Sequence, residues 1–185
     1  LDEAWAIGMN QAMAQGRTFG RDLYFTFGPY SSIFSEPYHP ATDLLMLFGS
    51  AYLAICYWFA LAHLTRTSQR WLPWLVWLVL AGLLSERDAR DTILLSYPLL
   101  VGLVGVRIAA GPVATRLDTA TIAVLSSAFG LLPLIKGSMS VACGLIGAAL
   151  FVLFALGRRW RIAAGLAVTP VVALVAFWLI AGQAL

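Results

Sequence analysis

Long apolar stretches separated by short polar links make up the chain after residue 42. A helix that crosses the hydrocarbon layer needs about 20 apolar residues, because it rises about 1.5 Å per residue across about 30 Å. The pattern therefore predicts an all-α, polytopic transmembrane helix bundle with about six spans. The second span is short, so a count of five stays open. The expected spans are residues 43–64, 71–84, 93–110, 119–135, 141–157 and 162–181.

The first 42 residues have a different pattern. Residues 2–15 favour a helix, and Gly16 is the residue type that most often ends a helix in the left-handed conformation. Glu3 and Asn10 face away from an apolar stripe. This pattern predicts an amphipathic helix in the membrane interface with its polar side toward water. The alternative is a connector without a site. The stripe consists of Leu1, Trp5, Met9, Ala12 and Met13.

Composition supports a membrane protein and excludes several other classes. The chain is 61% hydrophobic and 11% charged, far from the mixture typical of soluble domains. We therefore expect an integral membrane protein whose main partner is the lipid bilayer. The net charge of +3 is small and dispersed, which argues against nucleic acid. Cys56 and Cys143 lie in apolar stretches without ligand spacing, so no metal site is expected.

The charges predict how the chain is oriented. Cytoplasmic loops collect Lys and Arg, whereas acidic residues have little influence on orientation. If residues 1–42 lie outside, the inner links hold seven of the twelve basic residues and one of the nine acidic residues. We therefore predict that residues 1–42 form an extracytoplasmic loop with its interfacial helix, ahead of a bundle over residues 43–185. The outer side is then the expected working face.

The loop sequence "GRTFGRDLYFTFGPY" follows the first helix. The order of Asp2-Glu3, a short helix, Gly16, Arg21-Asp22 and an aromatic run ending in Gly28-Pro29-Tyr30 resembles the first extracytoplasmic loop of the GT-C superfamily. This superfamily of polytopic membrane glycosyltransferases includes protein O-mannosyltransferases and the aminoarabinose transferases of lipid A. The resemblance covers about the first 35 residues.

The resemblance implies a function and a location. Its members transfer a sugar from a polyprenyl-phosphate-linked donor to a glycan, lipid or protein acceptor on the non-cytoplasmic side of the membrane. The expected location is a bacterial inner (plasma) membrane. Because members begin with a membrane helix before this loop, the resemblance also implies that the chain is an N-terminal fragment lacking that first helix.

The acidic pair carries the expected catalysis. By the resemblance, Asp2 accepts the proton of the acceptor hydroxyl and Glu3 assists it. No cofactor is required, and a divalent cation held by both carboxylates is the alternative, since hard cations prefer carboxylate oxygens. The default interpretation is structural, because acidic residues stabilise the first turn of a helix.

Cations of the outer face are the expected phosphate ligands, because the arginine fork binds two oxygens at once and a lysine adds a point charge. Arg90 belongs to the same outer group. Two structural alternatives stay open: Lys136 extends toward the interface from the end of an apolar run, and the charges of "SERDARDT" pair with one another. The predicted substrate-binding residues are Arg17, Arg21, Asp22, Tyr30, Arg87, Asp91 and Lys136.

Two other functions stay open. A transporter or flippase of lipid-linked or anionic substrates generally has ionisable groups near the midplane of the membrane, and the predicted span centres carry none. A non-catalytic membrane scaffold would need none of the outer acidic residues.

Overall fold

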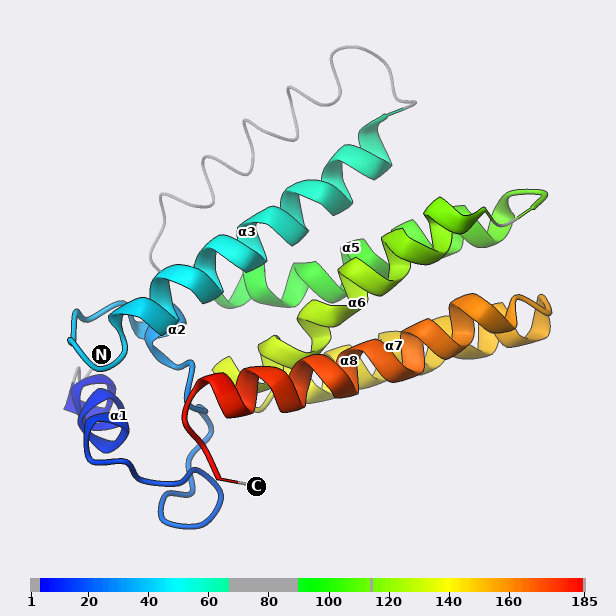
Figure 1. Cartoon of the computed structure of the whole chain (residues 1–185). Coiled ribbons are helices and arrows are strands. Elements are labelled where there is room, and N and C mark those ends of the chain that lie inside the picture. The colour runs from blue at the N-terminus through cyan, green and yellow to red at the C-terminus, as the bar shows by residue number, and fades with distance from the viewer. Residues whose placement is uncertain (1–3, 67–89, 114, 185) are drawn as a thin grey trace.

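The computed structural model describes residues 4–66, 90–113 and 115–184, and this part of the chain is all-helical (Figure 1). Five of the described helices are long and apolar enough to cross a membrane. The predicted fold class is therefore confirmed. The expected second span, residues 71–84, lies outside the described residues. The helices are α1 (Ala4–Ala14), α2 (Ser32–Ser35), α3 (Asp43–Thr65), α5 (Arg90–Ala110), α6 (Arg116–Ile135), α7 (Met139–Leu156) and α8 (Trp160–Ile180).

Several helices begin before their apolar run does. The sequence places the fourth span at residues 119–135, whereas α6 starts at Arg116. The extra turn is held by a capping box: the Thr115 hydroxyl accepts from the Asp118 amide at 3.1 Å, and the Asp118 carboxylate accepts from the Thr115 amide at 2.8 Å. Hydropathy alone misses this turn because Arg116 and Asp118 are charged.

Helix α6 is the most enclosed of the described spans. In its most apolar window, 61% of the residues are buried inside the protein, compared with 17% for α8. Helices α6 and α8 touch through their backbones at Gly130, where an added Cβ would lie 2.4 Å from the Leu174 nitrogen and 2.6 Å from the Pro170 carbonyl oxygen. Small residues permit such close packing of helices. The outer faces of α7 and α8 expose many apolar side chains, as lipid-facing helices do.

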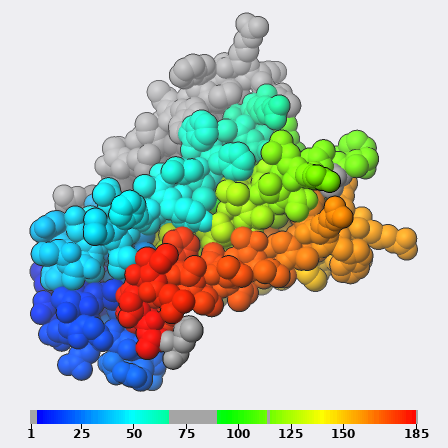
Figure 2. Space-filling view, in the orientation of Figure 1, coloured from blue at the N-terminus to red at the C-terminus, as the bar shows by residue number. Residues whose placement is uncertain are grey.

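The bundle has two distinct ends. Helices α3, α5 and α7 run away from the end where α1 and α2 lie, and α6 and α8 run back toward it (Figure 1). We call the first end the loop end; it holds residues 4–42 and the residues around Arg90, Lys136 and Ala181. We call the opposite end the arginine end; it holds the residues around Arg66, Ala110, Arg116 and Trp160. Residues 4–42 lie against the end of α8 (Figure 2).

Helix α1 differs from its prediction in one important respect. It ends before Gly16, whose φ of +66° is the predicted left-handed conformation. Asn10, however, is buried and does not face water. Its side-chain amide donates to the Pro37 carbonyl at 3.1 Å, and its amide oxygen accepts from the Thr42 hydroxyl at 3.1 Å. A polar group tolerates burial when both functions are bonded, so Asn10 attaches α1 to the start of α3.

Candidate functional site

Backbone hydrogen bonds attach the loop at residues 17–37 to the end of α6. The amide of Gly28 donates to the Ile135 carbonyl at 3.2 Å, and the amide of Tyr30 donates to the Leu134 carbonyl at 3.0 Å. These bonds satisfy carbonyls that the end of a helix leaves without partners. A Cβ on Gly28 would lie 2.4 Å from the Leu134 oxygen, so the contact requires glycine.

Lys136 directly follows α6, and its side-chain amine makes three contacts. Its Nζ lies 2.6 Å from Asp91 Oδ1 at the start of α5. The same nitrogen lies 4.8 Å from the ring centre of Phe34 and 5.3 Å from that of Phe27. These distances are typical of cation–π contacts. The side chain of Lys136 is 20% exposed and that of Asp91 is 47% exposed, so the pair is reachable from water.

Arg90, the first residue of α5, connects this helix to the loop. One of its terminal nitrogens donates to the Phe34 carbonyl at 2.6 Å, and the other lies 2.5 Å from Glu36 Oε2. Arg90 and Asp91 thus pair with other segments of the chain. The other charged residues of the segment at 85–92 lie outside the described part, so the alternative that these charges pair with one another stays a prediction.

A largely apolar cavity of about 380 Å³ lies between α2, α3 and α5. Arg90 and Glu36 supply its charged lining, and the other lining residues are mainly aliphatic and aromatic. The cavity therefore places one ion pair beside a volume suited to a hydrocarbon chain. The apolar lining includes Ile33, Leu53, Trp58, Leu94 and Leu132.

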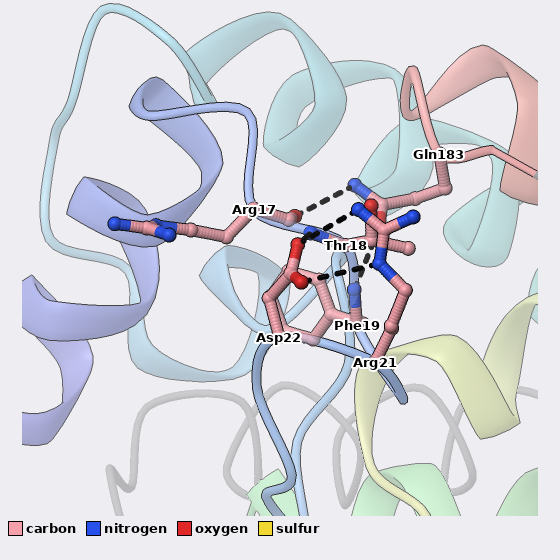
Figure 3. A network of polar contacts seen from close by, with 6 residues as sticks. All are labelled: Arg17, Thr18, Phe19, Arg21, Asp22 and Gln183. Carbon is pink, nitrogen blue, oxygen red and sulfur yellow. Dashed lines mark hydrogen bonds and ion pairs between the residues drawn. The ribbon is translucent and has the colours of Figure 1, made fainter.

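Arg21 and Asp22 form a third charge pair, in which the Arg21 side chain is 74% and the Asp22 side chain 28% exposed (Figure 3). Arg21 Nε donates to Asp22 Oδ1 at 3.1 Å, and the Thr18 amide donates to Asp22 Oδ2 at 2.9 Å. The hydrogen bond from Arg21 is the main cause that lowers the pKa of Asp22, and the bond from the Thr18 amide lowers it further. The guanidinium of Arg17 points away from this network.

The loop also contacts the residues after α8. The Gln183 side-chain oxygen accepts from the Phe19 amide at 2.9 Å, and its nitrogen donates to the Arg17 carbonyl at 3.5 Å (Figure 3). The loop and the C-terminal residues of the described chain are therefore held together at the loop end.

Tyr30 lies inside the protein. It is only 2% exposed, and its hydroxyl donates to the Phe177 carbonyl of α8 at 3.0 Å. Burial raises the pKa of Tyr30 to about 12. This environment fits a residue that fixes the loop onto the bundle.

The predicted site residues form two groups. Lys136 and Asp91 contact each other, as do Arg21 and Asp22, and no described contact joins the two pairs. Asp2, Glu3 and Arg87 lie outside the described residues. Across the described ranges, no group of three or more potential metal ligands occurs.

Sequence reasoning missed the partners of the cations at the loop end. Glu36, Phe27 and Phe34 contact Arg90 or Lys136, yet none of them stood among the predicted site residues. The usable signal was the aromatic run itself, since a lysine that follows an apolar span needs a partner and aromatic faces provide one.

Comparisons of the chain with protein-family models, with curated proteins and with solved structures find no match.

Proposed function

We propose that the chain is a membrane glycosyltransferase that moves a sugar from a polyprenyl-phosphate-linked donor to an acceptor at the loop end. One observation carries the proposal: Arg90 lies in the lining of an apolar cavity, and Lys136 is held close by through its pair with Asp91, the neighbour of Arg90. A lipid-linked sugar phosphate joins a hydrocarbon chain to an anion, which is the chemistry that this arrangement fits. The loop end would face the extracytoplasmic side of a bacterial inner membrane.

The isoprenoid chain would enter the apolar cavity, with its phosphate at Arg90. Glu36, the present partner of Arg90, is 59% exposed at its side chain and has room to move into water. A phosphate would then replace the carboxylate, because a guanidinium binds two phosphate oxygens in parallel. Lys136 would contribute a second positive charge.

The transfer step needs a proton acceptor and a stabilised leaving group. The oxygen of the acceptor hydroxyl attacks the anomeric carbon, and the bond between that carbon and the phosphate oxygen breaks. The phosphate leaves with the electron pair toward Arg90 and Lys136, and the hydroxyl proton moves to a carboxylate. Asp2, assisted by Glu3, is the proposed proton acceptor on the basis of the family resemblance. A divalent cation bound by this pair is the alternative role.

The test measures sugar transfer by the full chain in lipid nanodiscs. The probe is a polyprenyl-phosphate-linked sugar with a radiolabel in the sugar, and the readout is labelled sugar released from lipid into water or acceptor. Arg90→Gln and Lys136→Gln should each reduce release by at least tenfold. The matched control Arg66→Gln removes one charge at the arginine end and should leave release unchanged. Equal release from the chain and from empty nanodiscs would refute the proposal.

A second candidate, a non-catalytic scaffold, is favoured by the ion pairs themselves. Arg90 and Lys136 already have carboxylate partners, and these pairs hold the loop to the bundle without any ligand. Under this alternative, Arg90→Gln weakens the fold, and the lipid-linked sugar neither binds nor stabilises the chain. Binding of polyprenyl phosphate that raises the thermal midpoint of the chain but not of Arg90→Gln would argue against it.

A further inference from the structure

A second cavity lies at the arginine end, away from the proposed transfer site. It measures about 370 Å³ and is formed at the starts of α6 and α8. Four arginines contribute to its lining, and no acidic residue is among the described residues that line it. The polar and aromatic lining includes Arg116, Arg158, Arg159, Arg161, Thr119 and Trp160.

Most of this positive charge has no protein acceptor. Arg159 donates to the Ile108 carbonyl at 2.5 Å and to the Gly111 carbonyl, so its guanidinium caps the C-terminal end of α5. The guanidinium groups of the other three arginines make no hydrogen bond or ion pair in the described part of the chain. The Asp118 carboxylate accepts through Oδ2 from the amide and hydroxyl of Thr115 and makes no ion pair with a described arginine.

The fold alone does not favour arginine at these positions. Arg158 has a φ of +55°, a left-handed conformation that disfavours side chains other than glycine. Arg161 lies in the first turn of α8, where the helix dipole is positive and no acidic residue balances it. Backbone strain at Arg158 and the uncompensated charge of Arg161 therefore both disfavour arginine at these two positions in the described chain.

We propose that this cavity binds the phosphate group of an anionic phospholipid. A lipid is favoured over a free anion because the cavity lies at the end of candidate membrane spans. Trp160, one of its lining residues, is 62% exposed, and Leu156 before it is 81% exposed. Tryptophan is enriched at the level of lipid headgroups, and basic pockets between membrane helices bind anionic headgroups.

The test uses the full chain in neutral detergent micelles, titrated with short-chain phosphatidylglycerol at physiological salt. Arg161→Gln should weaken binding about fivefold, because one arginine near an anionic membrane surface contributes about 1 kcal/mol to binding. The matched control Arg66→Gln removes a charge at the same end but outside the cavity, and should change binding less than twofold. Equal weakening by both variants would show a general charge effect and overturn the site.

A second variant separates binding from folding. Arg158→Gly removes a cation and also relieves the left-handed backbone. We expect it to bind phosphatidylglycerol about fivefold more weakly while its thermal midpoint in micelles rises. Unchanged binding by this variant would contradict the proposal, whatever its stability.

Two further titrations identify the ligand. Short-chain phosphatidylcholine, which carries the same phosphate without net charge, should bind at least tenfold more weakly than phosphatidylglycerol. Inorganic phosphate should not compete at millimolar concentration. If inorganic phosphate competes as well as the lipid does, the ligand is a free anion and the lipid assignment is wrong.

Discussion

The two ends of the bundle differ in how most of their described cations are bound. At the loop end, Arg21, Arg90 and Lys136 each pair with a carboxylate. At the arginine end, Arg159 donates to backbone carbonyls, and three other arginines face a cavity without a protein acceptor in the described residues.

This difference indicates at which end an anionic ligand could bind without displacing a protein partner. A cation with a carboxylate partner is largely compensated already, so an anion at the loop end must displace that partner. A cation without a partner attracts an anion directly, and its removal should cost the fold little. Substitutions at the loop end should therefore change stability, and those at the arginine end should mainly change anion binding.

The largest effect is expected where the loop meets α6. Gly28→Ala places a methyl group against the Leu134 oxygen and displaces the two backbone bonds beside it. We expect a loss of about 3 kcal/mol in the free energy of unfolding, from overpacking and lost hydrogen bonds. Denaturant titration in mixed micelles measures it. Gly8→Ala is the control: it has no atom within 4 Å of an added Cβ and should be neutral or stabilising.

The ion pair at Lys136 should have the next largest effect. Lys136→Met leaves Asp91 without its partner and removes two aromatic contacts. For a partly exposed pair we expect a loss of about 1–2 kcal/mol in unfolding free energy. Arg66→Met at the other end should stay within about 0.5 kcal/mol of the parent chain. Similar losses for both variants would remove the contrast between the ends.

Tyr30 allows a test with a pH dependence. Tyr30→Phe removes the hydrogen bond to Phe177 and should cost about 1 kcal/mol. Because burial raises the pKa of Tyr30 from 10.0 to about 12, the folded state keeps its proton longer than the unfolded state. Stability should therefore fall as pH rises from 10 toward 12. Thermal midpoints across this range should fall less steeply in the Phe variant, and parallel curves would contradict the burial of the hydroxyl.

The smallest effect is expected at the exposed Arg21–Asp22 pair. The pKa of Asp22 is lowered in the folded loop, so its stabilising contribution is present above the ordinary aspartate pKa and is lost as pH falls through the lowered value. Asp22→Asn should speed proteolytic cleavage of residues 17–24 at neutral pH without changing the thermal midpoint of the bundle. Cleavage at the parental rate would show that the pair does not order the loop.

The helical bundle was predictable from the sequence because long apolar runs allow few other structures in lipid. The starts of α5 and α6 were not predictable from hydropathy, since the polar residues of their first turns lower it. At α6 these polar residues include Asp118, which forms a capping box with Thr115. The left-handed end of α1 followed directly from Gly16.

Partners across long sequence separations were harder to predict. Nothing local to Asn10 indicates that its amide bonds to Pro37 and Thr42, so helical periodicity placed it toward water incorrectly. Lys136 was recognised as a charged residue at the end of an apolar run, but its pairing with Asp91 depends on how α5 and α6 pack. The acidic pair at Asp2 and Glu3 lies outside the described residues and stays a prediction.

The backbone bonds that attach the loop to the end of α6 belong to an isolated antiparallel β-bridge between Phe27 and Lys136, and this pairing has a consequence for how the protein unfolds. The Gly137 amide donates to the Thr26 carbonyl at 2.6 Å on one side of it, and the Gly28 amide donates to the Ile135 carbonyl on the other. The loop and the α6–α7 turn therefore share their backbone bonds and belong to one cooperative unit. Local opening of either segment should release both, which makes the aromatic loop an integral part of the bundle.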